Sequence, residues 1–300
     1  MRLKTSSAFL LFVMCVLNSS AQLMPFQDDE DAINPSFQYN VIRDKKVSTI
    51  TIRYQNKPDG ARIKDDGIMK YFRFDDDGKL VESFYTVKEG YESWDTVRTL
   101  YYYYNNGKLS IKRTNEGTFM DTWYYTWYDD GAMKKRAHVH EVPLSTSGDF
   151  KIASQSVISS DSFAYSPYPK QLQRFGFNEE KTIYERTVTQ FDDNKRMVSR
   201  YCHYSVGWLY SQIDLSYDGV GRVTEYKLTG NLSGDTHRSV SIAYDTVAGV
   251  MISQKLFNDS KETDDIEYMY DKSTGLISNQ LDRDYIKSSI SIAGFTYEFR

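Results

Sequence analysis

The sequence predicts an all-β protein, an antiparallel meander of tandem β-hairpins in a curled or spiral sheet. Three observations support this prediction. An aromatic–acidic–turn–glycine pattern recurs along the chain, apolar and polar residues alternate with a period of two beside each copy, and no helical period follows the first 21 residues. The expected repeat domain spans residues 41–300, with a possible seam near residues 143–170, where Ser and Pro are frequent.

Residues 1–21 are expected to be a cleavable secretory signal. The chain starts with basic residues, and the apolar run from Ala8 to Leu17 is too short to span about 30 Å of hydrocarbon as a helix. Ser19 and Ala21 then place small side chains before the cleavage site. We therefore expect export to the periplasm, to the outer-membrane surface or out of the cell, without a transmembrane helix.

Composition narrows the class of protein. Residues 22–40 form an acidic leader, and removal of the two basic residues of the signal leaves 35 Lys and Arg against 41 Asp and Glu, a net charge of −6. This excess of negative charge gives no indication of binding to nucleic acid. Cys202 becomes the one remaining cysteine, so no intramolecular disulfide is possible. The stability of the fold must therefore come from buried side chains, and the sequence supplies 25 Tyr, 16 Phe and 4 Trp for this.

The repeat has a simple physical basis, and its clearest copy runs from Tyr217 to Val223 (YDGVGRV). The side-chain oxygen of the acid can accept a hydrogen bond from the backbone N–H two residues further on, and glycine adopts the positive φ of the turn. Related copies begin at Phe74, Tyr104, Tyr128, Phe191, Tyr244 and Tyr270, and a damaged copy at 165–172 fills the longest gap. Because a lone hairpin is unstable in water, we expect seven or eight to pack together, about 14–18 strands.

This pattern resembles the YD repeat of Rhs and teneurin-type proteins, whose consensus is Tyr-Asp-x-x-Gly-Arg followed by Leu or a similar residue and Thr. Residues 270–277 are a second fair match. The resemblance implies a spiral β-sheet and a short exported member of an uncharacterised Bacteroidetes-type family. The array has too few repeats to close a shell, and no distinct C-terminal domain follows it. The resemblance therefore does not imply toxin delivery.

The aromatic residues give the best indication of function. Residues 101–104 and 123–128 place aromatic rings on both faces of their strands. One face can build the core, and the other is exposed unless a second layer covers it. An exposed aromatic strip suits a sugar or a protein. The candidate binding residues are Tyr102, Tyr104, Trp123, Tyr125 and Trp127. The alternative is a strand that is buried on both faces.

The sequence contains no Gly-x-Ser-x-Gly elbow, phosphate-binding glycine loop or His-Glu-x-x-His motif. His138 and His140 lie on one face of a strand, about 7 Å apart, so they can share a metal, but a solvated or cross-strand pair is the better interpretation. Cys202 and His203 point to opposite faces and cannot form a nucleophile–base pair. Adjacent acids recur in the turns, where turn chemistry accounts for them. We expect no catalytic residue, no metal and no cofactor.

The sequence thus predicts a non-catalytic extracytoplasmic protein that binds a glycan, a cell-envelope component or a protein, in an oligomeric state left open. An alternative is an outer-membrane β-barrel. Residues 294–299 have the aromatic spacing of a barrel-assembly signal, but Arg300 ends the chain, and charges such as Arg73 and Lys112 fall inside strands. A less favoured alternative is a hydrolase whose site is assembled across distant turns.

Overall fold

The computed structural model describes residues 37–89, 93–144, 150–232 and 236–300. The predicted signal, residues 1–21, and most of the leader lie outside these residues. Within them the chain forms one short helix, α1 (Tyr39–Asp44), and otherwise strands. The strands are β1 (Val47–Pro58), β2 (Lys64–Phe74), β3 (Leu80–Glu89), β4 (Ser93–Asn105), β5 (Lys108–Asn115), β6 (Met120–Trp127), β7 (Met133–Pro143), β8 (Ile152–Tyr168), β9 (Gln171–Phe177), β10 (Ile183–Phe191), β11 (Met197–Tyr204), β12 (Tyr210–Tyr217), β13 (Val223–Gly230), β14 (Thr236–Tyr244), β15 (Met251–Asn258), β16 (Lys261–Tyr270), β17 (Ile277–Asp284) and β18 (Ser289–Phe299).

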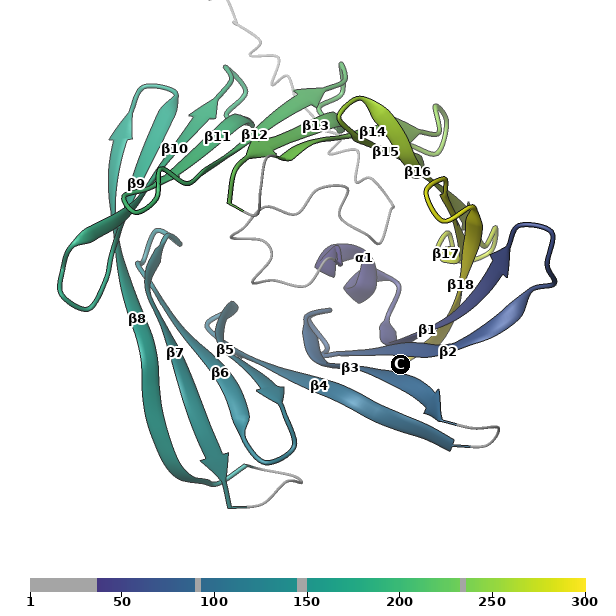
Figure 1. Ribbon diagram of the computed structural model, residues 1–300, viewed down its shortest axis with the longest axis horizontal. Helices are drawn as coiled ribbons and strands as arrows, with labels where there is room; N and C mark the ends of the chain where they lie inside the picture. The colour runs from purple at the N-terminus through teal and green to yellow at the C-terminus, as the bar shows by residue number, and fades with distance from the viewer. Residues whose placement is uncertain (1–36, 90–92, 145–149, 233–235) are drawn as a thin grey trace, which may run out of the picture.

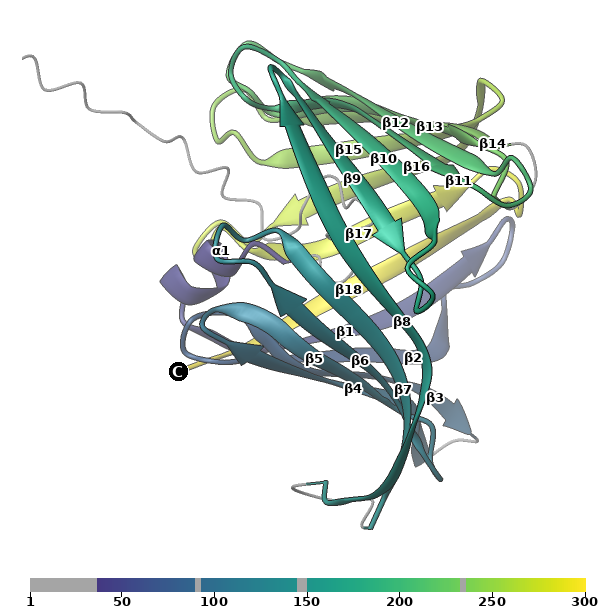
Figure 2. The same cartoon turned by 90° about the vertical axis from the view of Figure 1, so that its left-hand side faces the viewer.

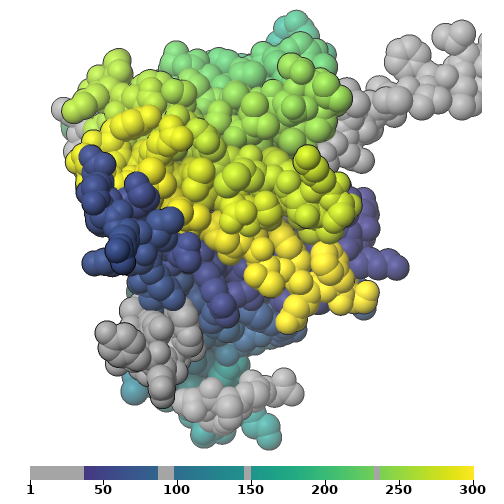
Figure 3. Space-filling model, turned by 90° about the vertical axis from the view of Figure 1, so that its right-hand side faces the viewer, coloured from purple at the N-terminus to yellow at the C-terminus, as the bar shows by residue number. Residues whose placement is uncertain are grey.

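The 18 strands close into a single antiparallel barrel (Figure 1). Each strand pairs with its neighbours in the chain, and β18 pairs back onto β1, from Val47 opposite Phe299 to Pro58 opposite Ser289. Figure 3 shows the surfaces of the first and last strands side by side. The all-β prediction is confirmed, but the prediction of an open curled or spiral sheet is wrong because its two edges meet.

A bulge repeated along the sheet gives a physical reason for closure. The strand register shifts at the aromatic residue of each turn: Phe74, Tyr104, Trp127, Phe191, Tyr217, Tyr244 and Tyr270. A bulge bends its strand and increases the local twist. Seven such bends at equivalent positions curl the sheet in one direction, and closure removes the two free edges. β8, the longest described strand, runs between the β9–β16 side and the β3–β7 side of the barrel in Figure 2.

The aromatic residues at the bulges also tie successive repeats together. The hydroxyl of Tyr244 donates to the carbonyl of Val223 at 2.8 Å, and that of Tyr270 donates to Met251 at 2.6 Å. Each acceptor is the first strand residue after the preceding repeat turn. A buried hydroxyl that finds a backbone acceptor satisfies both groups. The tyrosines therefore serve as core residues and as links between hairpins.

Two copies of the repeat show the same link in altered form. Tyr165 donates its hydroxyl to the carbonyl of Met133 at 3.0 Å, which supports the interpretation of residues 165–172 as a damaged copy. Trp127 Nε1 donates to the carbonyl of Leu109 at 2.7 Å, so the aligned aromatic of that copy is Trp127. The sequence alignment on Tyr128 was therefore displaced by one residue.

The acid of the repeat performs the predicted turn chemistry. Asp218 Oδ1 accepts the backbone N–H groups of Val220 at 3.0 Å and Arg222 at 2.9 Å. Gly221 has φ +93°, a left-handed conformation that costs other residues free energy. These bonds confirm that Asp218 stabilises the turn.

Helix α1 identifies the inner face of the barrel. Figure 1 places α1 inside the ring, and its Ile42 is fully buried in one core cluster with Ile50 of β1. Directly paired residues share a face of a sheet, and the register continues from Ile50 through Phe72 to Ser83. Ser83 Oγ lies 3.4 Å from the hydroxyl of Tyr102, so Tyr102 also faces inward.

The sequence pattern did not predict α1, because six residues are too few to show a helical period. The helix packs against the turn between β2 and β3, where a Cβ on Gly78 would lie 2.4 Å from the carbonyl oxygen of Tyr39. Among the described residues, no helix is long and apolar enough to cross a membrane.

Candidate functional site

The outward-facing side chains of the barrel are largely polar in the sector from β13 to β17. One row runs across these strands in register: Glu225, Ser241, Lys255, Asp265 and Arg283. Lys255 Nζ lies 3.8 Å from Asp265 Oδ2. A row of charged and polar side chains of both signs is typical of a surface in water.

The inner face contrasts with this surface. Strand pairing places Lys112, Trp123 and His138, on successive strands, on the same inner face as Tyr102. We use the name aromatic wall for seven aromatic residues on this side of β4, β6 and β8: Tyr102, Tyr104, Trp123, Tyr125, Trp127, Phe163 and Tyr165. The structure therefore brings all five sequence-predicted binding residues onto one inner surface.

The five predicted residues differ in exposure. Tyr125 is buried, with 6% of its surface exposed, whereas the other four are half-buried and pack against the same core cluster. Tyr104 lies beside Tyr39 of α1, and burial together with that contact raises the pKa of the Tyr104 hydroxyl. Much of the aromatic wall therefore belongs to the hydrophobic core, and only its half-buried rings can contact a ligand.

Polar groups are held in place around Trp123. The imidazole of His138 stacks on the Trp123 ring with centroids 4.3 Å apart and planes 1° from parallel. His138 Nε2 is hydrogen-bonded to Asp121 Oδ1, and the guanidinium of Arg136 lies 5.7 Å from the centre of the Trp123 ring. These contacts fix the position of the indole through stacking and cation–π attraction.

A second cationic cluster borders the aromatic wall at Phe163. The guanidinium carbons of Arg136 and Arg174 lie 5.5 and 5.2 Å from its ring centre. Arg136 Nε donates to Asp161 at 2.7 Å, and Arg174 donates to Glu185 at 2.7 Å. Both cations therefore have carboxylate partners. Sequence reasoning did not single out these residues because their proximity depends on the register of β7 to β10.

Lys112 differs from these arginines. It lies on the inner face between Tyr102 of β4 and Trp123 of β6. Among the described residues it has no hydrogen-bond or ion-pair partner, and burial lowers the pKa of its amine. A partly buried cation without a counter-charge costs free energy. From the sequence alone, this lysine is only a charge within a strand.

The predicted histidine pair does not converge on a common point. His138 stacks on Trp123, whereas His140 stacks on Phe119 with centroids 4.3 Å apart. Within the described ranges, no group of three or more His, Cys, Asp or Glu side chains has a metal-binding arrangement. Cys202 is buried, and burial raises the pKa of its thiol, so it is poorly suited to act as a nucleophile.

Glu141 forms a buried polar network on the opposite face of β5 to β7. Its carboxylate is fully buried and accepts hydrogen bonds from Arg113 Nε at 2.8 Å, from Thr122 Oγ1 at 2.7 Å and from the hydroxyl of Tyr124. Burial alone would raise the pKa of Glu141, but these donors hold it below its ordinary value. The network satisfies its own members and therefore has a structural role.

No family model matches the sequence, so no family match supports the resemblance to the YD repeat. No curated protein matches it either. A porin-like protein from Bacteroides uniformis ATCC 8492 aligns over 85% of this chain and 97% of its own, with 11% identity and a TM-score of 0.39. A porin-like protein from Bacteroides vulgatus ATCC 8482 aligns over 84% and 98%, with 9% identity and a TM-score of 0.33. The Photorhabdus luminescens Tc holotoxin pore aligns over 72% of this chain and 15% of its own, with 9% identity and a TM-score of 0.18.

These similarities are too distant to place the chain in a family. The barrel is established by the pairing of β18 with β1 in the chain itself. That closure is the architecture that the outer-membrane alternative requires, whereas the open sheet of the preferred sequence interpretation is excluded.

Proposed function

We propose that the protein is an exported, non-catalytic β-barrel of the cell envelope, and that it binds an acidic glycan or a similar envelope component at the aromatic wall beside Lys112. The observation that supports this proposal is the lack of a partner for Lys112 among the described residues. An anionic group on the ligand would supply the missing counter-charge. The half-buried Tyr102 and Trp123 would contact its ring or apolar part.

A binding experiment tests this proposal. Calorimetric titration of the purified protein with oligogalacturonate, and with neutral maltohexaose for comparison, should show binding of the acidic probe alone. Lys112→Met should weaken that binding at least about tenfold, the effect of losing one charge-assisted contact. Lys135→Met is the matched control, because Lys135 is exposed on the outer face of β7. Absence of binding across acidic glycans, or equal binding by the Lys112 variant, would refute the proposal.

Trp123 supplies a second readout for the same site. Its indole lies beside Lys112 and contacts His138 and Arg136 of β7. Binding at the aromatic wall should therefore change the fluorescence of Trp123, and the change should be smaller in Trp123→Phe, in which Trp127 is the remaining tryptophan of the wall. A ligand that binds without altering this signal would have to occupy another surface.

The closed ring favours a second candidate, an outer-membrane β-barrel. Closure satisfies every strand edge, as a membrane requires, and 18 is an even number of strands, as in bacterial single-chain barrels. Such a barrel also presents an apolar band about 25 Å tall to lipid. The outward row from Glu225 to Arg283 is charged, which supports the first candidate.

Cell fractionation separates the two candidates. An envelope barrel in water should be recovered without detergent, in the periplasmic or secreted fraction, or from membranes by an alkaline carbonate wash. A spanning barrel should stay in the outer membrane after that wash and require detergent for extraction. The second outcome would replace the first proposal.

A further inference from the structure

The two ends of the barrel carry different turns. One end has the repeat turns, with Gly78, Gly221 and α1. The other end, here called the loop end, has the connections that follow the odd-numbered strands, among them the turns after β1, β11, β13 and β17, because connections alternate between the ends of an antiparallel barrel. The repeat turns are accounted for by the acid–glycine pattern. The loop end also contains turn acids, such as Asp284, but its exposed apolar residues are explained neither by that turn chemistry nor by the aromatic wall.

Large apolar side chains protrude from the turns of the loop end. The exposed residues there are Ile63, Val206, Trp208, Leu232, Tyr285 and Ile286. Trp208 is 84% exposed and Ile286 is 71% exposed, although neither lies within a strand. Apolar side chains exposed singly are common on protein surfaces, whereas a group of them at one end of the barrel can form an interaction surface. They come from hairpins around the ring, so a broad, flat partner can contact them together.

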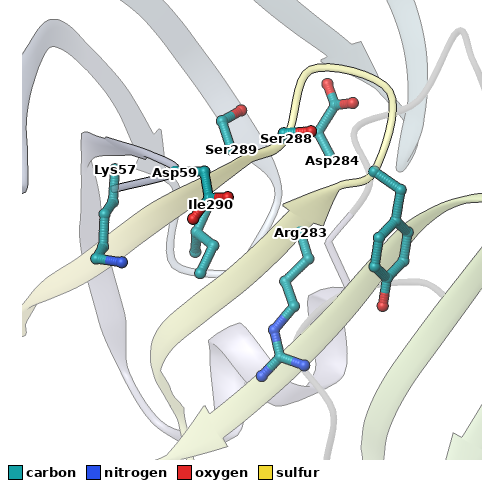
Figure 4. Close-up of a pocket in the computed structure, with 8 residues that line it drawn as sticks. Lys57, Asp59, Arg283, Asp284, Ser288, Ser289 and Ile290 are labelled. Atoms are coloured by element: carbon teal, nitrogen blue, oxygen red, sulfur yellow. The ribbon is translucent and has the colours of Figure 1, made fainter. Parts of the chain in front are cut away.

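A pocket of about 270 Å³ opens among the same turns (Figure 4). Lys57 of β1 and Arg283 of β17 flank Ile290 in register, which places their Cα atoms about 10 Å apart, twice the spacing of neighbouring strands. Both long side chains can therefore reach one anionic group above Ile290. Tyr285, about half exposed, borders the pocket.

The charges around this pocket leave its cations available. Lys57 has no ion-pair partner among the described residues, and Arg283 has one long contact, 3.4 Å to Glu267. The Asp284 carboxylate is occupied, since it lies 2.8 Å from Lys287 Nζ and accepts backbone N–H groups of its own turn. The carboxylate of Asp59 also lines the pocket without a partner among these residues and opposes an anion.

From these two features we propose that the loop end docks onto an anionic lipid bilayer, with Trp208 and Ile286 entering the interface and a lipid phosphate bound between Lys57 and Arg283. Aromatic and aliphatic side chains accompanied by cations are the usual residues of membrane-surface binding. Lys57 and Arg283 are the next-to-last residues of β1 and β17 and face outward at the rim of the loop end, so a bilayer that covers this end can bring a phosphate to them. This docking is independent of the ligand proposed for the aromatic wall.

Vesicle flotation of the purified protein tests the proposal. Binding to phosphatidylglycerol vesicles should exceed binding to phosphatidylcholine vesicles, and Trp208→Ser with Ile286→Ser should reduce it about tenfold or more. Val247→Ser is the matched control, because Val247 is 96% exposed in a repeat turn at the other end. Equal loss in the control would refute docking by the loop end, as would an absence of vesicle binding.

Charge variants test the pocket separately. Lys57→Met with Arg283→Met should reduce phosphatidylglycerol binding to the level of phosphatidylcholine, whereas Asp59→Asn should strengthen it severalfold. Arg73→Gln is the control for loss of an outer-face arginine, since Arg73 pairs with Glu82 outside the pocket. Thermal unfolding checks that each variant is folded. An unchanged lipid preference in the double variant, or binding of glycerol phosphate with none to vesicles, would refute the assignment. Lys112→Met should leave vesicle binding unchanged, so failure of one proposal is distinguishable from failure of the other.

Discussion

The guanidinium carbon of Arg222 lies 4.4 Å from the ring centre of Tyr244, which belongs to the next repeat of the barrel. The same arginine donates from Nε to Asp218 Oδ2 at 2.7 Å. One side chain therefore joins the turn acid of its own repeat to the aromatic of the following one. Arg196 makes the equivalent contact with Tyr217 at 4.5 Å. The arginine that follows the positive-φ residue of the turn, Gly221 or Lys195, is thus a link between hairpins.

Replacement of Arg222 by Gln should therefore destabilise the barrel. The variant loses a charge-assisted hydrogen bond and a cation–π contact at a partly exposed site, which together contribute about 1–2 kcal/mol to the free energy of unfolding. Urea denaturation followed by tryptophan fluorescence measures the change. Arg62→Gln, an exposed arginine in the loop after β1, should leave the midpoint unchanged. Equal midpoints for the two variants would show that the link contributes nothing.

Gly78→Ala should disturb the packing of α1. Gly78 has φ +79°, and a Cβ there would also lie 2.8 Å from the backbone nitrogen of Arg43. Gly60 has φ +69°, and a Cβ there would meet nothing within 4 Å, so Gly60→Ala carries the backbone cost alone, about 1 kcal/mol. The Gly78 variant should lose at least about 1 kcal/mol more. Hydrogen exchange should also be faster in α1, and unchanged exchange there would contradict the assigned contact.

The Glu141 network should make stability depend on pH. The donors from Arg113, Thr122 and Tyr124 hold the folded-state pKa of Glu141 below its ordinary value of 4.5. As pH falls, the unfolded chain therefore takes up its proton first, and the stabilisation present above the ordinary pKa is lost as pH falls through the folded-state pKa.

Glu141→Gln measures this contribution. The variant should lose about 3 kcal/mol at pH 7, because it leaves Arg113 without its buried partner. The difference in the free energy of unfolding between the variant and the wild type, measured by urea denaturation, should shrink as pH falls below the ordinary pKa of a glutamate. Glu180→Gln, exposed in a turn, is the control. A difference that stays constant down to pH 3 would contradict the titration of Glu141.

Arg300→Ala should weaken the closure of the barrel. The Arg300 side chain donates to the carbonyls of Val47 and Phe74, each at 3.1 Å, and to that of Asp75, so it joins β18 to β1 and to the turn after β2. Loss of these bonds should cost about 1–3 kcal/mol. Hydrogen exchange should accelerate in β1 and β18 in particular. Arg53→Ala removes an exposed arginine of β1 and should have no such effect. Uniform acceleration over all strands would argue against a specific role in closure.

Sequence reasoning was most successful where the determining contacts are local. The alternation around Ile213 and Leu215 and the turn at Asp218 depend on residues a few positions apart, and both were predictable. The alignment of the copy at Tyr128 was wrong by one residue, because Tyr128 and Trp127 are both aromatic. The register shift at Trp127 and its bond to Leu109 distinguish them.

The candidate site was predictable only in part. Alternation placed Trp123, Tyr125 and Trp127 on one face, but it did not say whether that face is inward. The position of Lys112 between Tyr102 and Trp123 depends on the register of three strands, which the alternation within a single strand does not determine.

The sequence by itself determined that the chain is built from β-hairpins, since period-two alternation and acid–glycine turns act over a few residues. Tertiary structure decided that the sheet closes, because the pairing of Val47 with Phe299 joins residues about 250 positions apart and depends on the summed curvature of the repeated bulges. It also decided which face became the interior, through the burial of Ile42 of α1 against β1. The aromatic wall and the loop end exist only as consequences of that closure.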